Sequence, residues 1–204
     1  EDALIVGISG RYEFKNKGID VFIDAMGQLN RNNGLGKEVL AFILVPAGHA
    51  GANKELLHNL ELPYQAVTST DLYLTHYLND SANDPVMNRI RAQKLRNSEE
   101  DKVKIFFVPS YLNGDDGVFN MPYYDLLVGM DLTAFPSYYE PWGYTPLESL
   151  AFKVPTITTT LAGFGLWVKE HYNMNHPGIE VIHREDGDAS NVATAIAEWV
   201  KNYT

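Results

Sequence analysis

The chain has 204 residues and no cysteine. Disulfide bonds are therefore excluded, and a reducing compartment is allowed. No apolar run approaches the roughly 20 residues of a membrane-spanning helix, and the first residues carry no basic, signal-like segment. These absences favour a cytoplasmic protein that has no membrane partner.

Positive charge is scarce. The chain has 16 Lys and Arg residues and 26 Asp and Glu residues, which give a net charge of −10. Binding of nucleic acid requires clustered positive charge. The composition therefore argues against a nucleic-acid partner. An anionic ligand can still bind where a few basic residues converge.

Several familiar site motifs are also missing. The six histidines show no His-Glu-x-x-His spacing, and there is no Ser-His-Asp set and no Gly-x-Gly-x-x-Gly fingerprint. Asp186-Gly187-Asp188 matches the Asp-x-Asp pattern of metal-dependent sugar transferases. It precedes the last predicted helix, however, where Asp188 or Ser190 would serve as a cap. Residues 113–117 form a turn cluster too short for a calcium loop, so we expect no metal site.

Apolar runs and helical spacings alternate along most of the chain, which predicts an α/β fold: a Rossmann-like, doubly wound parallel sheet in one domain. Residues 51–100 interrupt this order as a polar, helical insertion, with Leu56, Leu57 and Leu60 on one helix face. The predicted strands are residues 3–9, 38–46, 103–109, 131–135, 154–159 and 179–183, and the predicted helices are 19–29, one from 84, 125–129, one from Thr145, 166–172 and 192–200.

The first strand starts almost at the first residue, which is not Met. We therefore expect the chain to be a piece of a longer polypeptide. The insertion at 51–100 is either a solvated surface or a subunit contact, so a homo-oligomer stays open.

Three loops follow strands and should lie at the same edge of the sheet: residues 10–18, 136–145 and 159–165. The first loop carries Arg11 and Lys17, which can bind a phosphate. They can equally be solvated loop cations, and spacing alone does not decide between the two. The third loop ends in glycines and can be an ordinary strand-to-helix turn.

The second loop carries Glu140 and Gly143 and leads into a helix expected to begin at Thr145. Thr145 and Glu148 have the pattern of a capping box, whereas Glu140 has no such structural role, which favours a functional one. Glu148 could alternatively accept a hydroxyl such as that of a ribose. Trp142 could stack on a sugar or anchor the loop.

At these residues the chain resembles the glycogen synthases of animal and fungal type, retaining glycosyltransferases with the two-domain GT-B fold. The resemblance rests on residues 9–18, 135–148 and 158–165, and above all on the block Tyr-Tyr-Glu-Pro-Trp-Gly-Tyr-Thr-Pro at 138–146. It implies that residues 1–204 are the carboxyl-terminal, nucleotide-sugar-binding half, with the amino-terminal domain absent. The sequence departs from the family at Leu147 and around 113–119.

The resemblance also implies roles for site residues. Arg11 and Lys17 match the pair that binds the donor diphosphate, and Glu140 matches the glutamate beside the reacting glucose. The remaining matches are donor-binding: Gly143, Tyr144 and Thr145 around the phosphates, Glu148 on the ribose, and Tyr123, rather than the adjacent Tyr124, stacked on uracil.

The implied reaction is transfer of glucose from UDP-glucose or ADP-glucose to the 4-hydroxyl of an α-1,4-glucan, with retention and without a metal or cofactor. The isolated chain should bind nucleotide weakly and show no useful transfer, because the acceptor site belongs to the other domain. The alternatives are another GT-B nucleotide-sugar enzyme, such as an epimerase, and a non-catalytic nucleotide- or glucan-binding module.

Overall fold

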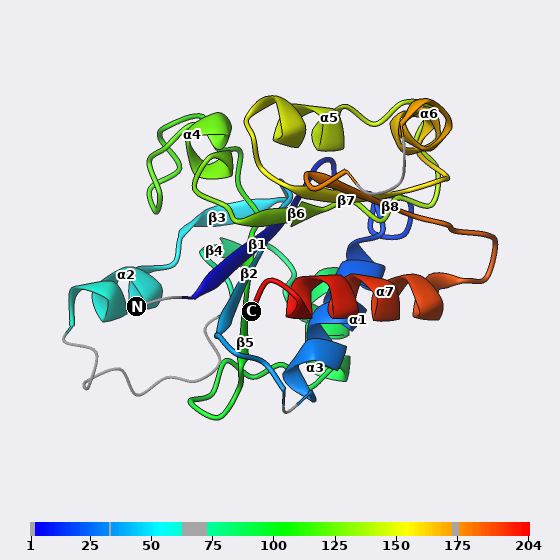
Figure 1. The fold of residues 1–204 in the computed structure, drawn as a ribbon. Coiled ribbons are helices and arrows are strands. Elements are labelled where there is room, and N and C mark those ends of the chain that lie inside the picture. Colours follow the sequence, from blue (N-terminus) through cyan, green and yellow to red (C-terminus); the bar gives the residue numbers. More distant parts are fainter. Residues whose placement is uncertain (1–2, 33, 63–72, 173–175) are drawn as a thin grey trace.

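Six parallel strands form one sheet in the computed structural model, which describes residues 3–32, 34–62, 73–172 and 176–204 (Figure 1). They lie in the order β5-β2-β1-β6-β7-β8. Counted along the chain, this is the order 3-2-1-4-5-6 of the doubly wound fold, so the predicted fold class is confirmed. The strands are β1 (Leu4–Ser9), β2 (Val39–Leu44), β5 (Val103–Val108), β6 (Leu132–Ala134), β7 (Thr156–Thr159) and β8 (Ile179–Ile182).

The strand order reverses between β1 and β6, which pair in parallel through Val6–Leu132 and Gly7–Thr133. From β1 the chain winds outward to β2 and β5, and from β6 it winds the other way to β7 and β8. In open sheets of this kind, ligands bind beyond the carboxyl ends of the strands at such a switch point. The loops after β1 and β6 are therefore the first place to look for a site.

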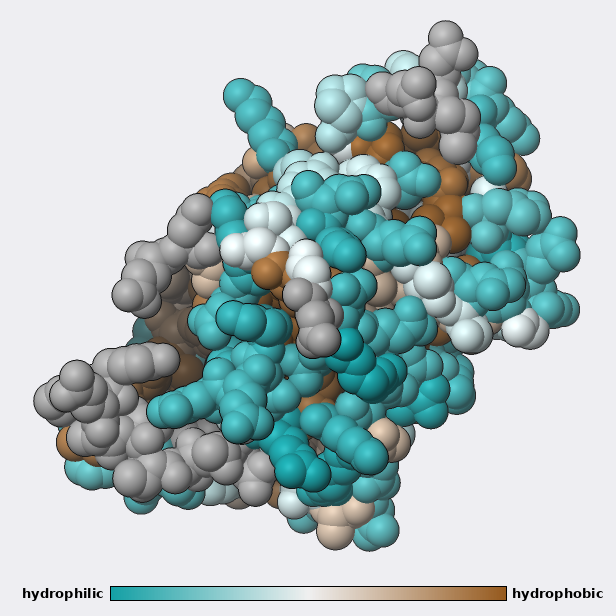
Figure 2. All heavy atoms as spheres, turned by 60° about the horizontal axis from the view of Figure 1, so that its bottom comes forward, coloured by the Kyte–Doolittle hydropathy of each residue, from teal (hydrophilic) through white to brown (hydrophobic). Residues whose placement is uncertain are grey.

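Helices cover both faces of the sheet (Figure 1). One face carries α4 (Tyr123–Leu127), α5 (Tyr144–Ala151) and α6 (Gly163–His171). The other carries α1 (Ile19–Asn30), α3 (Pro85–Ala92) and α7 (Ala189–Lys201), and α1 packs against both α3 and α7. Hydrophilic residues cover most of the side seen in Figure 2, in keeping with the acidic composition.

The core lies between the sheet and α1, which is flanked by α3 and α7. Alternate residues of β1, such as Val6 and Ile8, are fully or almost fully buried, as are Phe22, Ile23 and Met26 of α1. Burying a side chain of this size contributes about 1.5–3 kcal/mol. Apolar residues recur at every second position of the strands and about every 3.6 positions of the helix, and both sets face this layer. The apolar pattern of the sequence therefore determines the packing.

The expectation of a helical insertion at 51–100 was incomplete. The segment contains α2 (Lys54–Glu61) and α3, but also an antiparallel strand pair, β3 (His49–Ala52) with β4 (His76–Leu78). These strands are short and not apolar, so periodicity does not reveal them. None of the α2 residues is buried, and Leu60 is 68% exposed. Leu72 and its neighbours at 63–71 lie outside the described residues.

Several predicted helix boundaries were also wrong. Helix α6 begins at Gly163, so Gly163 and Gly165 lie within the helix rather than before it. Helix α7 begins at Ala189, with Asp188 at its N-cap position, yet neither Asp188 nor Ser190 makes a side-chain cap. Instead, a carboxylate oxygen of Asp188 accepts a hydrogen bond from Asn191. In contrast, Asp84 caps α3 as its Asp-Pro start suggests, accepting from the Met87 amide at 3.0 Å.

No helix in the described part of the chain combines the length and the apolar character that crossing a bilayer requires.

The two helices of the insertion should differ sharply in their contribution to stability. Ile90→Ala in α3 removes a fully buried side chain and should lower the free energy of unfolding by about 2–5 kcal/mol. Leu60→Ala in α2 is the matched control and should change it by less than about 0.5 kcal/mol. Urea denaturation measures both, and equal losses in the two variants would contradict this assignment of the core.

Candidate active site

The loops after β1 and β6 touch at Gly18 and Pro136. Gly18 has φ 69°, and a Cβ at this position would lie 2.0 Å from the Pro136 carbonyl oxygen. A side chain is excluded there by both the backbone conformation and the contact. Two residues further along, the Tyr138 amide donates to the Asn16 carbonyl oxygen at 2.8 Å. The two loops at the switch point are thus held together by backbone contacts.

Lys17 and Glu140 form an ion pair between these two loops. The Lys17 ammonium donates to Glu140 Oε2, and the two side chains are only 15% and 18% exposed. Lys17 and Glu140 are 123 positions apart in the sequence. Because solvent screens a partly buried pair less than an exposed one, this contact is electrostatically stronger than a surface salt bridge.

Arg11 lies in the same loop but does not reach Glu140. Its guanidinium pairs with Glu13 at 3.0 Å, and its side chain is 78% exposed. An exposed pair of this kind contributes little to stability, about 0–1 kcal/mol, so Arg11 is not held strongly in place. The structure brings together Lys17 and Glu140 but not the full predicted set of three.

The third loop fixes the backbone around Glu140. The Glu140 amide donates to the Leu161 carbonyl oxygen at 3.2 Å, and the Gly163 amide donates to the Glu140 carbonyl oxygen at 3.0 Å. A Cβ on Gly163 would lie 2.2 Å from the Pro141 carbonyl oxygen, so this close approach requires glycine. With its own amide and carbonyl both bonded, Glu140 presents its carboxylate from a defined position.

The predicted capping box at Thr145 and Glu148 does not form. Helix α5 begins one residue earlier, at Tyr144, and Gly143 is its N-cap in the left-handed conformation with φ 95°. No side chain among the described residues caps this helix end. Since Thr145 is already inside the first turn, its hydroxyl is not placed as a cap, and Glu148 is free for another contact.

Glu148 bonds to a tyrosine of α4 instead. The Tyr124 hydroxyl donates to Glu148 Oε1 at 3.1 Å, and this hydrogen bond raises the pKa of Tyr124. The Tyr124 ring stacks on Phe152, with centroids 4.9 Å apart. The carboxylate predicted to hold a ribose is therefore oriented by the element that also carries Tyr123.

Tyr123 lies against the end of β1. Its hydroxyl is 2.7 Å from Ser9 Oγ, and burial, above all other causes, raises the pKa of Tyr123. Its amide donates to the Leu112 carbonyl oxygen at 3.0 Å. Tyr124, by contrast, is 44% exposed. Tyr123 is thus held by hydrogen bonds at the end of β1, whereas Tyr124 is partly open to solvent.

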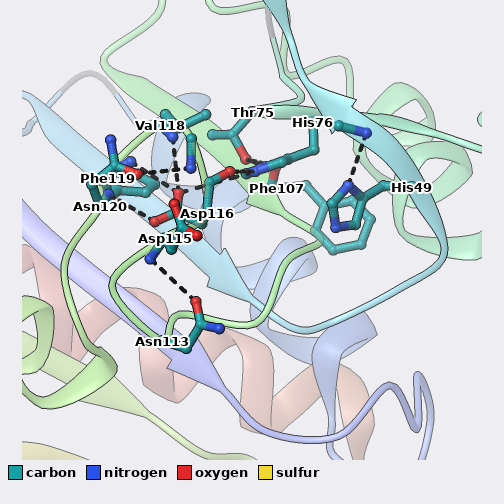
Figure 3. Close-up of polar contacts among 12 residues, drawn as sticks. His49, Thr75, His76, Phe107, Asn113, Asp115, Asp116, Val118, Phe119 and Asn120 are labelled. Atoms are coloured by element: carbon teal, nitrogen blue, oxygen red, sulfur yellow. Dashed lines mark hydrogen bonds and ion pairs between the residues drawn. The ribbon is translucent and has the colours of Figure 1, made fainter.

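The loop before α4 has an anchor that sequence reasoning missed (Figure 3). The Asp116 carboxylate accepts hydrogen bonds from the amides of Val118, Phe119 and Asn120 at 2.7–3.1 Å. The Asp116 carbonyl oxygen in turn accepts from Nε2 of His76, which is fully buried in β4. The prediction of a turn at 113–117 was correct, but a partner 40 residues away in the sequence leaves no local signal.

An apolar cavity of about 230 Å³ lies beside α4, lined by residues such as Ile5, Phe42, Phe119 and Met130. None of the predicted site residues lines it. The contact of Lys17 with Glu140 thus lies outside this cavity.

Comparison with known proteins agrees with the resemblance. The family model described as glycogen synthase matches residues 1–69 and 65–204. The chain belongs to the glycogen synthase family. This membership confirms the predicted family, and the six-stranded sheet is consistent with one half of a GT-B fold.

Relatives of this member of the glycogen synthase family come from fungi and mammals. Glycogen [starch] synthase isoform 2 of Saccharomyces cerevisiae is 31% identical over 268 aligned residues, covering 98% of the chain and 38% of the relative. The Neurospora crassa enzyme is 30% identical, with 100% and 37% covered, and the liver enzyme of Rattus norvegicus is 30% identical, with 84% and 31% covered. The chain therefore spans less than two-fifths of the length of these relatives.

A histidine beside the Asp116 anchor makes stability depend on pH. His49 packs against His76 with ring centroids 4.7 Å apart, and its Nδ1 accepts from the Gly51 amide at 3.1 Å. Burial, followed by the neighbouring His76, lowers the pKa of His49 from 6.5. A lowered pKa favours the neutral form in the folded state. The stabilisation contributed by neutral His49 is thus fully present above about pH 6.5, and it is lost as the pH falls below that value.

We expect the free energy of unfolding to fall between about pH 7 and pH 5, and to fall less in His49→Asn, whose side-chain oxygen can still accept from Gly51. The matched control is His183→Asn, at a side chain that is 61% exposed, and it should keep the wild-type dependence. Urea denaturation at several pH values measures this. If His49→Asn shows the same fall as wild type, His49 is not the group responsible.

Proposed function

We propose that this chain is the donor-binding, carboxyl-terminal half of a cytoplasmic glycogen synthase that transfers glucose from UDP-glucose or ADP-glucose to an α-1,4-glucan. The observation that carries the proposal is the partly buried contact of Lys17 with Glu140 at the switch point of the sheet. Family membership supports it, because both residues belong to the segments that resemble the family.

Lys17 is proposed to bind the donor diphosphate. An ammonium group has three N–H donors, so contact with one Glu140 oxygen leaves donors for phosphate oxygens. The uncapped start of α5 after Gly143 adds backbone amides and the positive end of a helix. Arg11, exposed in the same loop, supplies a second cation. Negative charge that develops on the departing diphosphate is stabilised by these groups, which is usually the largest catalytic contribution.

Glu140 is proposed to act on the glucose. When Lys17 turns toward the diphosphate, the Glu140 carboxylate is left to orient the sugar or to stabilise positive charge on its ring. The acceptor hydroxyl would attack from the face that the diphosphate leaves, and a departing phosphate oxygen would take its proton. In this scheme Glu140 forms no covalent intermediate, and the reaction requires no metal.

The nucleoside is proposed to lie along α4. Glu148, oriented by the Tyr124 hydroxyl at 3.1 Å, can accept a ribose hydroxyl, and Tyr123 can stack on the base. Tyr144 and Thr145 in the first turn of α5 complete the phosphate side. The acceptor site would belong to a second domain, and for that reason we expect the 204 residues alone to bind nucleotide but to show no useful transfer.

Ligand binding can be tested on the chain itself. A nucleotide at about 100 times its dissociation constant should add about 2.7 kcal/mol to the free energy of unfolding. A thermal shift with UDP, ADP and their glucose conjugates identifies the donor. Lys17→Met should weaken binding about 10- to 100-fold, because a charged hydrogen bond is lost. Lys15→Met is the control, since Lys15 is 76% exposed and pairs with Asp20. Equal binding by both variants would remove Lys17 from the site.

Catalysis requires the complete two-domain protein. Glu140→Gln should lower the transfer rate by at least about 100-fold while the dissociation constant for UDP stays within about twofold. Glu170→Gln, at an exposed position of α6, should leave both unchanged. Unaltered transfer in Glu140→Gln would favour a non-catalytic binding module, and clear turnover by the isolated 204 residues would refute the two-domain proposal.

A further inference from the structure

Arg184 is a buried arginine just beyond β8. It is 5% exposed, whereas arginine is rarely buried unless it is paired. One guanidinium N–H donates to the Pro136 carbonyl oxygen, and among the described residues Nε has no hydrogen-bond partner. Burial lowers the pKa of Arg184, which reflects the cost of placing this charge in the interior. Such a costly residue needs an explanation.

The segment after β8 holds the loop after β6 at two points. The Arg184 guanidinium carbon lies 5.4 Å from the centroid of the Tyr138 ring, and another part of the same guanidinium bonds to Pro136. The Tyr138 hydroxyl donates to a carboxylate oxygen of Asp186. The Arg184 guanidinium thus holds residues 136–138 at the Pro136 backbone and at the Tyr138 ring. The Asp186 carboxylate holds the Tyr138 hydroxyl, at the far end of the ring.

The segment at 136–138 is the one that joins the two halves of the candidate active site. Gly18 packs against the Pro136 carbonyl oxygen, which also accepts the hydrogen bond from Arg184. The Tyr138 amide donates to the Asn16 carbonyl oxygen. Glu140 follows two residues later. A displacement of residues 136–138 would therefore move Glu140 relative to Lys17.

We propose that Arg184 and Asp186 are positioning residues, which hold the loop after β6 so that Glu140 faces Lys17. A planar guanidinium suits this task, because it can donate to a carbonyl oxygen and lie over a ring at the same time. Asp186 belongs to the Asp-x-Asp pattern, and its contact with Tyr138 gives that aspartate a role other than metal binding. The catalytic consequence rests on the proposed function, whereas the structural contact does not.

The structural part is tested by hydrogen exchange on this chain. The amides of Tyr138 and Glu140 are both bonded across loops, so they report on the position of the segment. In Arg184→Lys and Tyr138→Phe, peptides covering 136–143 should exchange about 10-fold faster, and peptides of α1 should be unchanged. Glu185→Gln, at a side chain that is 75% exposed, is the control. Exchange within about twofold of wild type in both variants overturns the proposal.

The catalytic part is tested in the complete protein by separating kcat from binding. Misplacing Glu140 should lower kcat about 10- to 100-fold in Arg184→Lys and less in Tyr138→Phe, with the dissociation constant for UDP within about twofold. Asp186→Asn, which keeps an acceptor oxygen, should retain most of the activity. An unchanged kcat despite faster exchange overturns the positioning role, as does a parallel loss of UDP binding.

The two proposals can fail separately. If Glu140→Gln leaves transfer unchanged, the proposed function fails, and hydrogen exchange still decides whether Arg184 and Asp186 hold the loop. If Arg184→Lys does not fold, Tyr138→Phe still tests whether the segment after β8 holds the loop, because it removes only the hydroxyl that donates a hydrogen bond to Asp186.

Discussion

The close approach of two loops at Gly18 and Pro136 is the constraint on which the candidate site depends. The loops follow β1 and β6, which are far apart in the sequence but neighbours in the sheet. A glycine with φ 69° allows the backbones to touch, and a Cβ would lie 2.0 Å from a carbonyl oxygen. One residue before this contact is Lys17, and four residues after Pro136 is Glu140. The ion pair between them is a consequence of the backbone approach.

The chemistry of the candidate site is set by opposite charges on an acidic protein. With a net charge of −10, the surface as a whole repels an anion. Lys17, a cation that is 15% exposed, lies here in contact with the Glu140 carboxylate. Glu140 is held by backbone bonds on both sides, and the proposed function requires it to stay in place when Lys17 is shared with the diphosphate. An acid and a cation in contact can thus serve different parts of one substrate.

Much of this arrangement could be predicted from the sequence. Alternating apolar patterns indicated the order of the strands and helices, and the rule that ligands bind at the carboxyl edge placed residues 10–18, 136–145 and 159–165 together. The capping prediction at Thr145 failed because Gly143 adopts a left-handed conformation, and the helix therefore starts at Tyr144. Local sequence does not reveal which of two adjacent residues begins a helix.

Long-range polar contacts account for what the sequence did not show. His76 and Asp116 bond across 40 residues, and Arg184 and Pro136 across 48. Neither pair has a spacing rule, because each depends on how separate elements pack. A lone arginine after a strand resembles a solvated residue until its 5% exposure is known. The exposed fraction of each side chain therefore distinguishes structural cations from surface cations, whereas the composition of the sequence does not.

Helix α2, which buries none of its residues, has a consequence for how the family can vary in length. The alignment with the yeast relative covers 268 residues, more than the whole chain contains, and the two family-model matches meet at residues 65–69. The yeast relative thus has more residues than this chain within the aligned region, and the family-model match divides shortly after α2. Adding residues beside an element outside the core removes no packing contact, and closing a longer loop costs only about 0.6 kcal/mol for each doubling of its length. Evolution could lengthen or shorten the protein here without disturbing the contact of Lys17 with Glu140.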